Sequence, residues 1–454
     1  QRQMCIRDRI KVSQAYYCED PFLNQLGVNP VFNLLTSTLD DNRKENRTLH
    51  LMSEEDALSK VQKYLHRQGI DRLSPIARKV EREGTPNRRN VVLVFMESMS
   101  ANLMGTFGSD KKLTPYLDSL YQQSLSFSHF YSSGIHTNHG IYSTLYSFPA
   151  IMKRNAMKGS VIPVYSGLPT VLQENGYCNL FFMTHESQYD NMNAFLRTNG
   201  FDEIYAQENY PSEKVVNSFG VQDDFMYQYA LPILNERAGT GNPFFSVLLS
   251  ISNHPPYVIP PYFHPHSDVL EEQIVEYADW SIRQFMQAAE KQPWFDNTIF
   301  VFLGDHGKMV GTPECEMPQS YNHIPLMIYG KDIKPGVYDG FGGQVDVSPT
   351  LLGLLNISYL QNNFGVNLLE EERPCMFFTA DNLIGARDSV NMFIYSPDSQ
   401  QEFKYKLEEG KLHAATGTDE EAFRNLKDYC FSMLQSTESL VKEHKTLDKV
   451  SVKK

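Results

Sequence analysis

The stretch 300-FVFLGDHGK-308 decides the fold class of this chain. It continues an apolar run that begins at Thr298 and stops abruptly at Gly304, directly before Asp305 and His306. Short apolar runs bounded by glycine are typical of buried strands in a parallel sheet. In open α/β sheets, ligands bind just beyond the carboxyl ends of such strands. Asp305 and His306 are therefore predicted at a sheet edge, where a carboxylate and an imidazole form a suitable pair of metal ligands.

Three other apolar runs of strand length also end in residues that can bind a ligand. The runs cover residues 90–96, 177–183 and 243–252, and the polar residues at the four strand ends are Glu97, His185, His254 and Asp305–His306. Each has a simpler explanation alone, because Glu97 could cap a helix and a lone histidine is more often structural. Together they indicate one divalent cation beside a phosphate-like ligand.

Helical patterns lie between and after these strands, and this alternation is typical of βαβ units around a parallel sheet. The predicted helices cover residues 31–39, 57–65, 115–124, 141–152, 169–175, 222–234, 271–291, 349–357 and 419–442. A further strand is predicted at 326–330, and the runs at 376–380, 391–396, 403–407 and 412–415 are typical of antiparallel strands. Ser53 and Ser348 are the predicted caps of two of these helices.

The sequence thus predicts an α/β fold with a mostly parallel central sheet, helices on both faces and a small C-terminal α+β subdomain. Residues 10–88 are interpreted as a helical lead-in or linker, 89–374 as the main domain and 375–454 as the subdomain. Residues 1–9, QRQMCIRDR, resemble a translated adapter sequence left by assembly and are interpreted as an artefact. We therefore expect a chain cut at its N-terminus, with a signal or membrane anchor upstream.

Composition excludes some classes of function. The net charge of −13 argues against nucleic acid as the main partner, which would favour a basic face. No apolar run approaches the ~20 residues that cross a bilayer. The six cysteines are scattered without metal-type spacing, so free and mostly buried thiols are expected.

Thr137 is the candidate nucleophile. It lies in a glycine-bounded turn, GIHTNHG, just before a predicted helix. A bound cation lowers the pKa of a hydroxyl, and a helix start offers N–H donors to an anionic substrate. Thr137 could instead serve only as the helix cap. Ser98, Ser143 and Thr144 remain alternatives.

Five motifs together resemble one known family. They are NVVLVFMES (90–98), GIHTNHG (134–140), SISNHPPY (250–257), FLGDHG (302–307) and YNHIPLMIYG (321–330). In order and spacing they resemble the sulfatase-like branch of the alkaline phosphatase superfamily, over about residues 88 to 360. Within it, the likeness is closest to lipoteichoic acid synthase-type phosphoglycerol transferases and related phosphoethanolamine transferases.

The resemblance implies a site. It makes Glu97, Thr137, Asp305 and His306 the ligands of one divalent metal ion, with Thr137 also the nucleophile. Mn²⁺ is the first candidate for this ion, and Mg²⁺ or Zn²⁺ are alternatives. His254 then holds the phosphoryl group or assists the leaving group. The implied activity is the transfer of a phospho-headgroup from a lipid donor through a phospho-threonine intermediate.

The sequence also departs from its relatives. True sulfatases need a C/S-x-P-x-R motif, but Thr137 is followed by Asn-His-Gly-Ile, so sulfate-ester hydrolysis is disfavoured. The tryptophan and arginine of phosphoglycerol transferases are replaced by HESQYDNMN, residues 185–193. The predicted substrate contacts are His185, Tyr189, Asp190, Asn191, His254 and His323.

Two alternatives remain open. The same residues could serve a phosphodiesterase, a phosphatase or another sulfatase-family hydrolase with water as the acceptor. A non-catalytic sensor is the other alternative, although the complete ligand set argues against it. The implied partner is a lipid headgroup or phosphodiester, with no nucleic acid. The implied location is the cell membrane, with an extracytoplasmic catalytic domain held by the upstream anchor.

Overall fold

A computed structural model describes residues 49–70, 75–158, 162–408, 410–415 and 420–447. Its centre is an eight-stranded sheet in which only β10 runs antiparallel to its neighbours. In spatial order the strands are β11 (Gly336–Gly343), β3 (Leu125–Tyr131), β10 (Leu326–Tyr329), β9 (Thr298–Gly304), β2 (Asn90–Met96), β8 (Phe244–Leu249), β4 (Cys178–Met183) and β5 (Glu203–Tyr205). The predicted α/β class with a mostly parallel sheet is confirmed.

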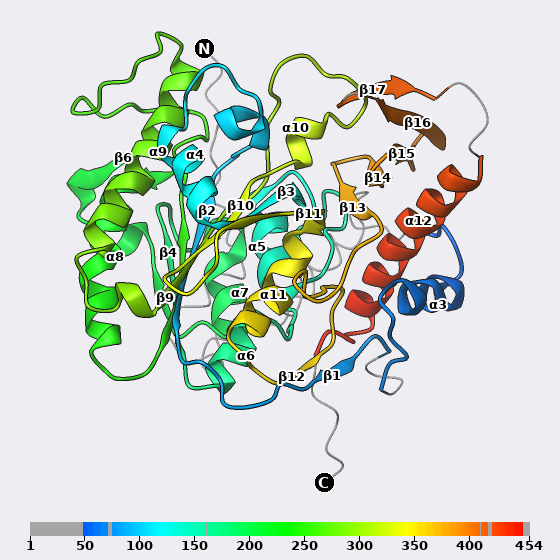
Figure 1. The fold of residues 1–454 in the computed structure, drawn as a ribbon, viewed down its shortest axis with the longest axis horizontal. Coiled ribbons are helices and arrows are strands. Elements are labelled where there is room, and N and C mark those ends of the chain that lie inside the picture. The colour runs from blue at the N-terminus through cyan, green and yellow to red at the C-terminus, as the bar shows by residue number, and fades with distance from the viewer. Residues whose placement is uncertain (1–48, 71–74, 159–161, 409, 416–419, 448–454) are drawn as a thin grey trace, which may run out of the picture.

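Helices cover both faces of this sheet (Figure 1). Side chains of β2 alternate between the two cores, with Val91, Leu93 and Phe95 on one face and Val92 and Val94 on the other. One face is covered by α5 (Thr137–Tyr146), α6 (Leu168–Glu174), α7 (Met192–Thr198) and α11 (Val347–Leu354). The other is covered by α4 (Pro115–Gln123), α8 (Asp223–Ala238) and α9 (Leu270–Ala289). Because both faces are buried, the central strands are continuous apolar runs.

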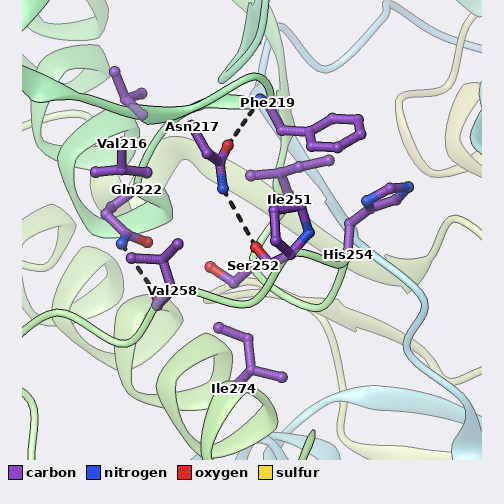
Figure 2. A pocket seen from close by; sticks show the side chains of 11 residues that line it. Val216, Asn217, Phe219, Gln222, Ile251, Ser252, His254, Val258 and Ile274 are labelled. Carbon is purple, nitrogen blue, oxygen red and sulfur yellow. Dashed lines mark hydrogen bonds between the residues drawn. The ribbon is translucent and has the colours of Figure 1, made fainter. Parts of the chain in front are cut away.

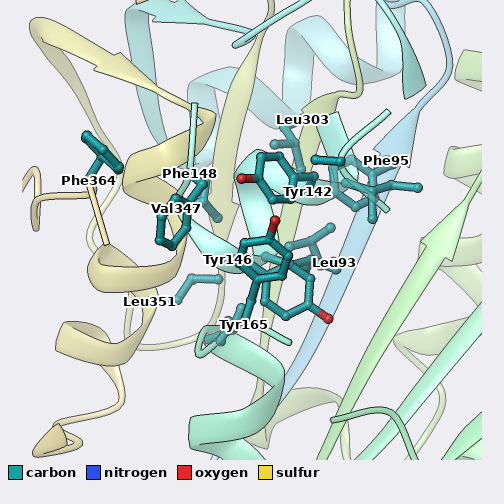
Figure 3. Close-up of a cluster of buried hydrophobic side chains, with 14 of the residues drawn as sticks. Leu93, Phe95, Tyr142, Tyr146, Phe148, Tyr165, Leu303, Val347, Leu351 and Phe364 are labelled. Carbon is teal, nitrogen blue, oxygen red and sulfur yellow. The ribbon is translucent and has the colours of Figure 1, made fainter. Parts of the chain in front are cut away.

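Helix α5 lies inside the first of these cores, where Tyr142 and Tyr146 pack among other aromatic rings (Figure 3). The predicted helix at 141–152 is wrong at both ends, because α5 begins at Thr137 and stops at Tyr146. Ser147 closes it in the left-handed region, with φ 58°, and Pro149 follows two residues later. Proline disfavours helical conformation in the residue before it, so the chain leaves the helix here.

The C-terminal region forms an antiparallel sheet covered by a long helix. Its strands are β13 (Met376–Thr379), β14 (Ile384–Arg387), β15 (Asn391–Ser396), β16 (Gln401–Glu408) and β17 (Lys411–Ala414), followed by α12 (Glu420–Lys442). The predicted strands and helix of this region are confirmed. The sequence prediction missed β14, whose four residues include a glycine.

The lead-in packs against the C-terminal helix. Helix α3 (Glu54–Tyr64) lies beside α12, where Lys60 pairs with Asp428 at 2.6 Å and the rings of Tyr64 and Tyr429 are 5.0 Å apart. Further along, β1 (Arg78–Val80) pairs with β12 (Tyr359–Gln361). The lead-in is therefore part of the folded body from α3 onward. The predicted helix at 31–39 and the segment 1–9 lie outside the described residues.

Two local predictions have different outcomes. Ser53 caps α3 as predicted, because its Oγ accepts a hydrogen bond from the Asp56 N–H at 3.1 Å. The predicted cap Ser348 is wrong, since α11 begins at Val347 after Asp346. The Asp346 carboxylate instead forms a buried pair with Arg373 at 2.6 Å, a partner that lies 27 residues further along the chain.

The described cysteines are unpaired, as expected. Cys375 and Cys430 are buried, and Cys178 and Cys315 are half-buried. Among the described residues, no helix is long and apolar enough to span a bilayer.

Candidate active site

The ends of two neighbouring strands build the centre of the site. β2 and β9 are parallel partners, with Met96 opposite Gly304, so the residues that follow them emerge side by side. Glu97, Asp305 and His306 each place one ligand atom within 4.8 Å of the others. His306 Nε2 lies 3.8 Å from Glu97 Oε1 and 3.6 Å from Asp305 Oδ2. We call these three residues the acidic cluster.

Thr137 joins this cluster from a different element. As the first residue of α5, it places Oγ1 3.4 Å from Glu97 Oε2, to which it donates a hydrogen bond. The first turn of α5 packs against the backbone that follows β9. This close packing requires a glycine at position 140. A Cβ at Gly140 would lie only 2.2 Å from the Asp305 carbonyl oxygen. The N–H groups of His139 and Gly140 donate to the His136 carbonyl at 2.9 and 3.1 Å, whereas those of Thr137 and Asn138 have no partner among the described residues and are available to an anion.

Hydrogen bonds hold the acidic cluster rigidly. Asp305 Oδ1 accepts from the backbone N–H groups of Ser98 at 2.8 Å and His306 at 2.7 Å. The Ser98 hydroxyl donates to Glu97 Oε1 at 2.8 Å. Gln344 Nε2 donates to the Asp305 carbonyl at 2.7 Å, which fixes the backbone. The ligand atoms are thus oriented by partners around them, as in metal sites generally.

The cluster fits a divalent cation. Asp305 Oδ2 is buried, and no described residue donates a hydrogen bond to it. Burial, together with the charge of Asp305, raises the pKa of Glu97 well above its usual range. Two buried carboxylates in contact are unfavourable as a pair unless a positive charge compensates them. Two carboxylates, an imidazole and a hydroxyl suit Mn²⁺, Mg²⁺ or Zn²⁺.

His254 stands on the loop after β8. Its Nδ1 donates to the Pro255 carbonyl at 2.6 Å, and Nε2, which has no partner among the described residues, is available to a substrate. Figure 2 shows its ring beside that of Phe219, and the ring centroids are 4.2 Å apart. The loop is tied to the cluster by Asn253, whose Nδ2 donates to the Ser98 carbonyl at 3.0 Å.

The remaining predicted contacts divide into two places. The rings of His185 and Tyr189 are 4.8 Å apart, and burial lowers the pKa of His185. Asp190 accepts a hydrogen bond from Asn138 Nδ2 at 3.0 Å. Asn138 directly follows Thr137, so Asp190 lies next to the candidate nucleophile. Asp190 and Asn191 both adopt left-handed backbone conformations, with φ of 53° and 69°. Aspartate and asparagine adopt this conformation more readily than other residues with a side chain, so the two residues form a tight turn directly before α7.

His323 makes a different set of contacts. Its Nε2 donates to the Ser128 carbonyl at 2.9 Å, and its ring stacks on Tyr131 with centroids 5.3 Å apart. Burial lowers its pKa to about 4. These contacts join β3 to the segment before β10. The assignment of His323 to substrate binding stays a prediction.

Two lysines near the site had no assigned role in the sequence. Lys158 Nζ pairs with Asp190 at 2.7 Å. Lys308 directly follows the metal-ligand motif, and its Nζ lies 2.5 Å from Asn253 Oδ1. Burial lowers the pKa of Lys308 to about 8, although Glu271 and Glu97 oppose this change. Only the folded chain shows that the Lys308 side chain turns back toward the His254 loop.

Solved structures of other proteins share this fold. It superposes on a Vibrio parahaemolyticus protein of the alkaline phosphatase superfamily with a TM-score of 0.77, 25% identity, and coverage of 86% of this chain and 97% of that one. It superposes on the lipoteichoic acid synthase LtaP from Listeria monocytogenes with a TM-score of 0.68, 22% identity, and coverage of 85% and 98%. The fold and the site together define an enzyme of the alkaline phosphatase superfamily.

Sequence comparison narrows the class. The sulfatase family model matches residues 89–357, which is more than half of the chain. The chain belongs to the sulfatase family. It is also 25% identical to the lipoteichoic acid synthase-like protein YvgJ of Bacillus subtilis, over 72% of this chain and 56% of that protein. The chain spans about half the length of the curated relatives it matches.

Proposed function

We propose that this chain is the catalytic part of a metal-dependent transferase that moves a phospho-headgroup, of phosphoglycerol or phosphoethanolamine type, from a lipid donor. The family and the relatives support a phosphotransferase or hydrolase. The observation that carries the finer proposal is the contact of Thr137 Oγ1 with Glu97, beside the buried cluster. A threonine in this place can form a phosphate ester, but it cannot become the formylglycine of true sulfatases.

The proposed reaction has two steps. In the first, Thr137 Oγ1 attacks the phosphorus of the donor, so a P–O bond to Thr137 forms and the bond to the diacylglycerol oxygen breaks. The proton of the Thr137 hydroxyl goes to the leaving alcohol through His254 or water. In the second, an acceptor hydroxyl attacks phosphorus, the bond to Thr137 breaks, and the acceptor's proton returns to Thr137.

The residues that would bind the metal are Glu97, Thr137, Asp305 and His306. A divalent cation, with Mn²⁺ as our first choice, would supply positive charge that favours the ionised hydroxyl and stabilises the phosphoryl oxygens. The N–H groups at the start of α5 add donors for the same oxygens. His254, through its free Nε2, is the group placed to hold the phosphoryl group or carry the leaving-group proton.

The headgroup is assigned to the side of the site that carries Tyr189 and Asp190. Asp190 is linked to Asn138, next to the nucleophile, and the ring of Tyr189 is about half exposed. The ring of His185 contacts that of Tyr189, with the centroids 4.8 Å apart. A lipid donor requires a membrane, so we place the whole protein at the cell membrane with its catalytic domain outside the cytoplasm. The names of the relatives, lipoteichoic acid synthases, support this placement.

The test separates transfer from hydrolysis. The chain is incubated with Mn²⁺ and vesicles of phosphatidylglycerol or phosphatidylethanolamine, with glycerol as the added acceptor alcohol. A transferase releases diacylglycerol and attaches the headgroup to glycerol. A hydrolase releases diacylglycerol and the free phosphorylated headgroup. Cleavage of p-nitrophenyl sulfate with no diacylglycerol from either lipid would contradict the proposal.

A further inference from the structure

Lys308 lies between the acidic cluster and the His254 loop. Its backbone is fixed by Ser100, whose Oγ accepts from the Lys308 N–H at 2.8 Å and donates to the Lys308 carbonyl at 3.0 Å. Gly307 permits this close turn, because a Cβ there would lie 2.1 Å from the Ser320 carbonyl oxygen. The side chain of Lys308 therefore starts from a fixed point, two residues after His306.

The ammonium of Lys308 reaches Asn253 and Tyr257, which lie before and after His254 in the same loop. Nζ donates to Asn253 Oδ1 at 2.5 Å and lies 5.7 Å from the centre of the Tyr257 ring. Asn253 in turn donates to the Ser98 carbonyl, next to Glu97. One side chain thus connects the metal-ligand segment to the loop of His254.

The Lys308 side chain is half-buried, and its ammonium has no ionic partner among the described residues. No carboxylate among the described residues forms an ion pair with Lys308; the acidic groups nearby, Glu271 and Glu97, act on it only at longer range. Burying a charge without an opposite charge is costly, and one amide oxygen and one ring face compensate it only in part. The ammonium also has three donors, of which Asn253 takes one. The remaining donors are available to an anion that enters the site.

We infer that Lys308 binds a non-bridging oxygen of the substrate's phosphodiester group, on the side of the site where His254 stands. The inference rests on the proposed function and adds a substrate-binding residue to it. In this arrangement the phosphoryl oxygens are held from two sides, by the start of α5 beside Thr137 and by the ammonium of Lys308. The matching ligand is a monoanionic phosphodiester, whose single charge the ammonium compensates.

The test measures anion binding without turnover. Diethyl phosphate, a monoanionic phosphodiester, is titrated by calorimetry into the Mn²⁺-loaded chain. Lys308→Gln keeps a donor for Asn253 and removes the charge, whereas Lys308→Met removes both. We expect either variant to weaken diethyl phosphate binding by about 10- to 100-fold, with Mn²⁺ affinity and melting temperature unchanged. Lys308→Arg should recover part of the affinity, and Lys331→Met, an exposed lysine paired with Asp296, is the matched control.

The outcomes are distinct. Unchanged diethyl phosphate affinity in a folded, Mn²⁺-loaded Lys308→Gln chain would overturn the inference. Loss of folded protein in both neutral variants would also overturn it, because Lys308 would then serve only to hold the Asn253 loop. If binding depends on Lys308 but no lipid is turned over, the inference stands and the proposed transferase function fails. If the Lys308→Gln chain turns over lipid as well as the wild type, the proposed transferase function is supported and the inference about Lys308 is wrong.

Discussion

Thr137 Oγ1 donates a hydrogen bond to Glu97 Oε2 at 3.4 Å, although 40 residues separate the two in the chain. Glu97 is buried at the end of β2, and Thr137 opens the buried helix α5. A cation bound by Glu97 would also contact the Thr137 hydroxyl and lower its pKa. The hydroxyl is therefore suited to act as a nucleophile. The contact therefore joins the metal-binding and ester-forming parts of the proposed mechanism.

Replacement of Thr137 tests its role as nucleophile. We expect Thr137→Ala to lower kcat by at least about 10³-fold, because no other group takes over the covalent step. Mn²⁺ binding should weaken but remain measurable, since three ligands stay in place. Thr137→Ser keeps a hydroxyl and should retain some turnover. Full activity of Thr137→Ala on a phosphodiester would refute the assignment.

Gly140 tests the fit of α5 against β9. In Gly140→Ala the added methyl would meet the Asp305 carbonyl at 2.2 Å, so helix and strand must separate. We expect the free energy of unfolding to fall by about 1–3 kcal/mol. Turnover should fall as well, because Thr137 moves away from Glu97. Gly336→Ala is the control, since a Cβ there meets nothing within 4 Å. Equal stability and activity of the two variants would contradict the close approach.

The turn between β13 and β14 contacts the residue that precedes Thr137. Asp381 lies 2.6 Å from His136 Nε2, and His136 is the residue that caps α5 before Thr137. Both side chains are about half exposed, so the pair should add at most about 1 kcal/mol to stability. We expect Asp381→Asn to lower kcat by about 3- to 10-fold with little change in melting temperature. Glu402→Gln, in the same sheet, is the control, and a kcat equal to that control would show that the pair does not position Thr137.

Asp279 is expected to make stability depend on pH. Burial raises its pKa to about 7, although the N–H groups of Leu117 and Tyr116 oppose this change. Because the folded state holds this proton more tightly than the unfolded state, the stabilisation is complete below pH 4. It is lost as the pH rises toward and through 7. Between pH 5 and pH 8, urea unfolding of the wild type should therefore lose about 1–3 kcal/mol more than that of Asp279→Asn.

The matched control for this measurement is Asp296→Asn, at an exposed aspartate. It should keep the pH dependence of the wild type. If Asp279→Asn shows the same pH dependence as the wild type, Asp279 does not titrate differently in the folded and unfolded states, and the prediction is wrong.

The central strands and the acidic cluster could be predicted because their signals are local. β2 and β9 are seven-residue runs buried along their whole length, so composition alone identifies them. Glu97 and Asp305 each follow such a run directly. In a parallel sheet this places both at one edge. That β2 and β9 are neighbours depends on strand order, which the sequence does not encode locally.

Other parts could not be predicted because their signals are weak or distant. β3 contains Ser126, Ser128 and His129, which interrupt an apolar pattern, and β11 contains four glycines. The contact of α3 with α12 joins residues far apart in the chain. Lys308 was visible beside the ligand motif, but its role depends on where its flexible side chain ends.

The most direct test of the account is a crystal of the chain grown with Mn²⁺ and measured for anomalous scattering. The account predicts one strong peak bounded by Glu97, Asp305, His306 and the Thr137 hydroxyl, and its loss in Asp305→Asn. A peak elsewhere, or separate ions on Glu97 and Asp305, would contradict the claim that these residues share one cation beside Thr137.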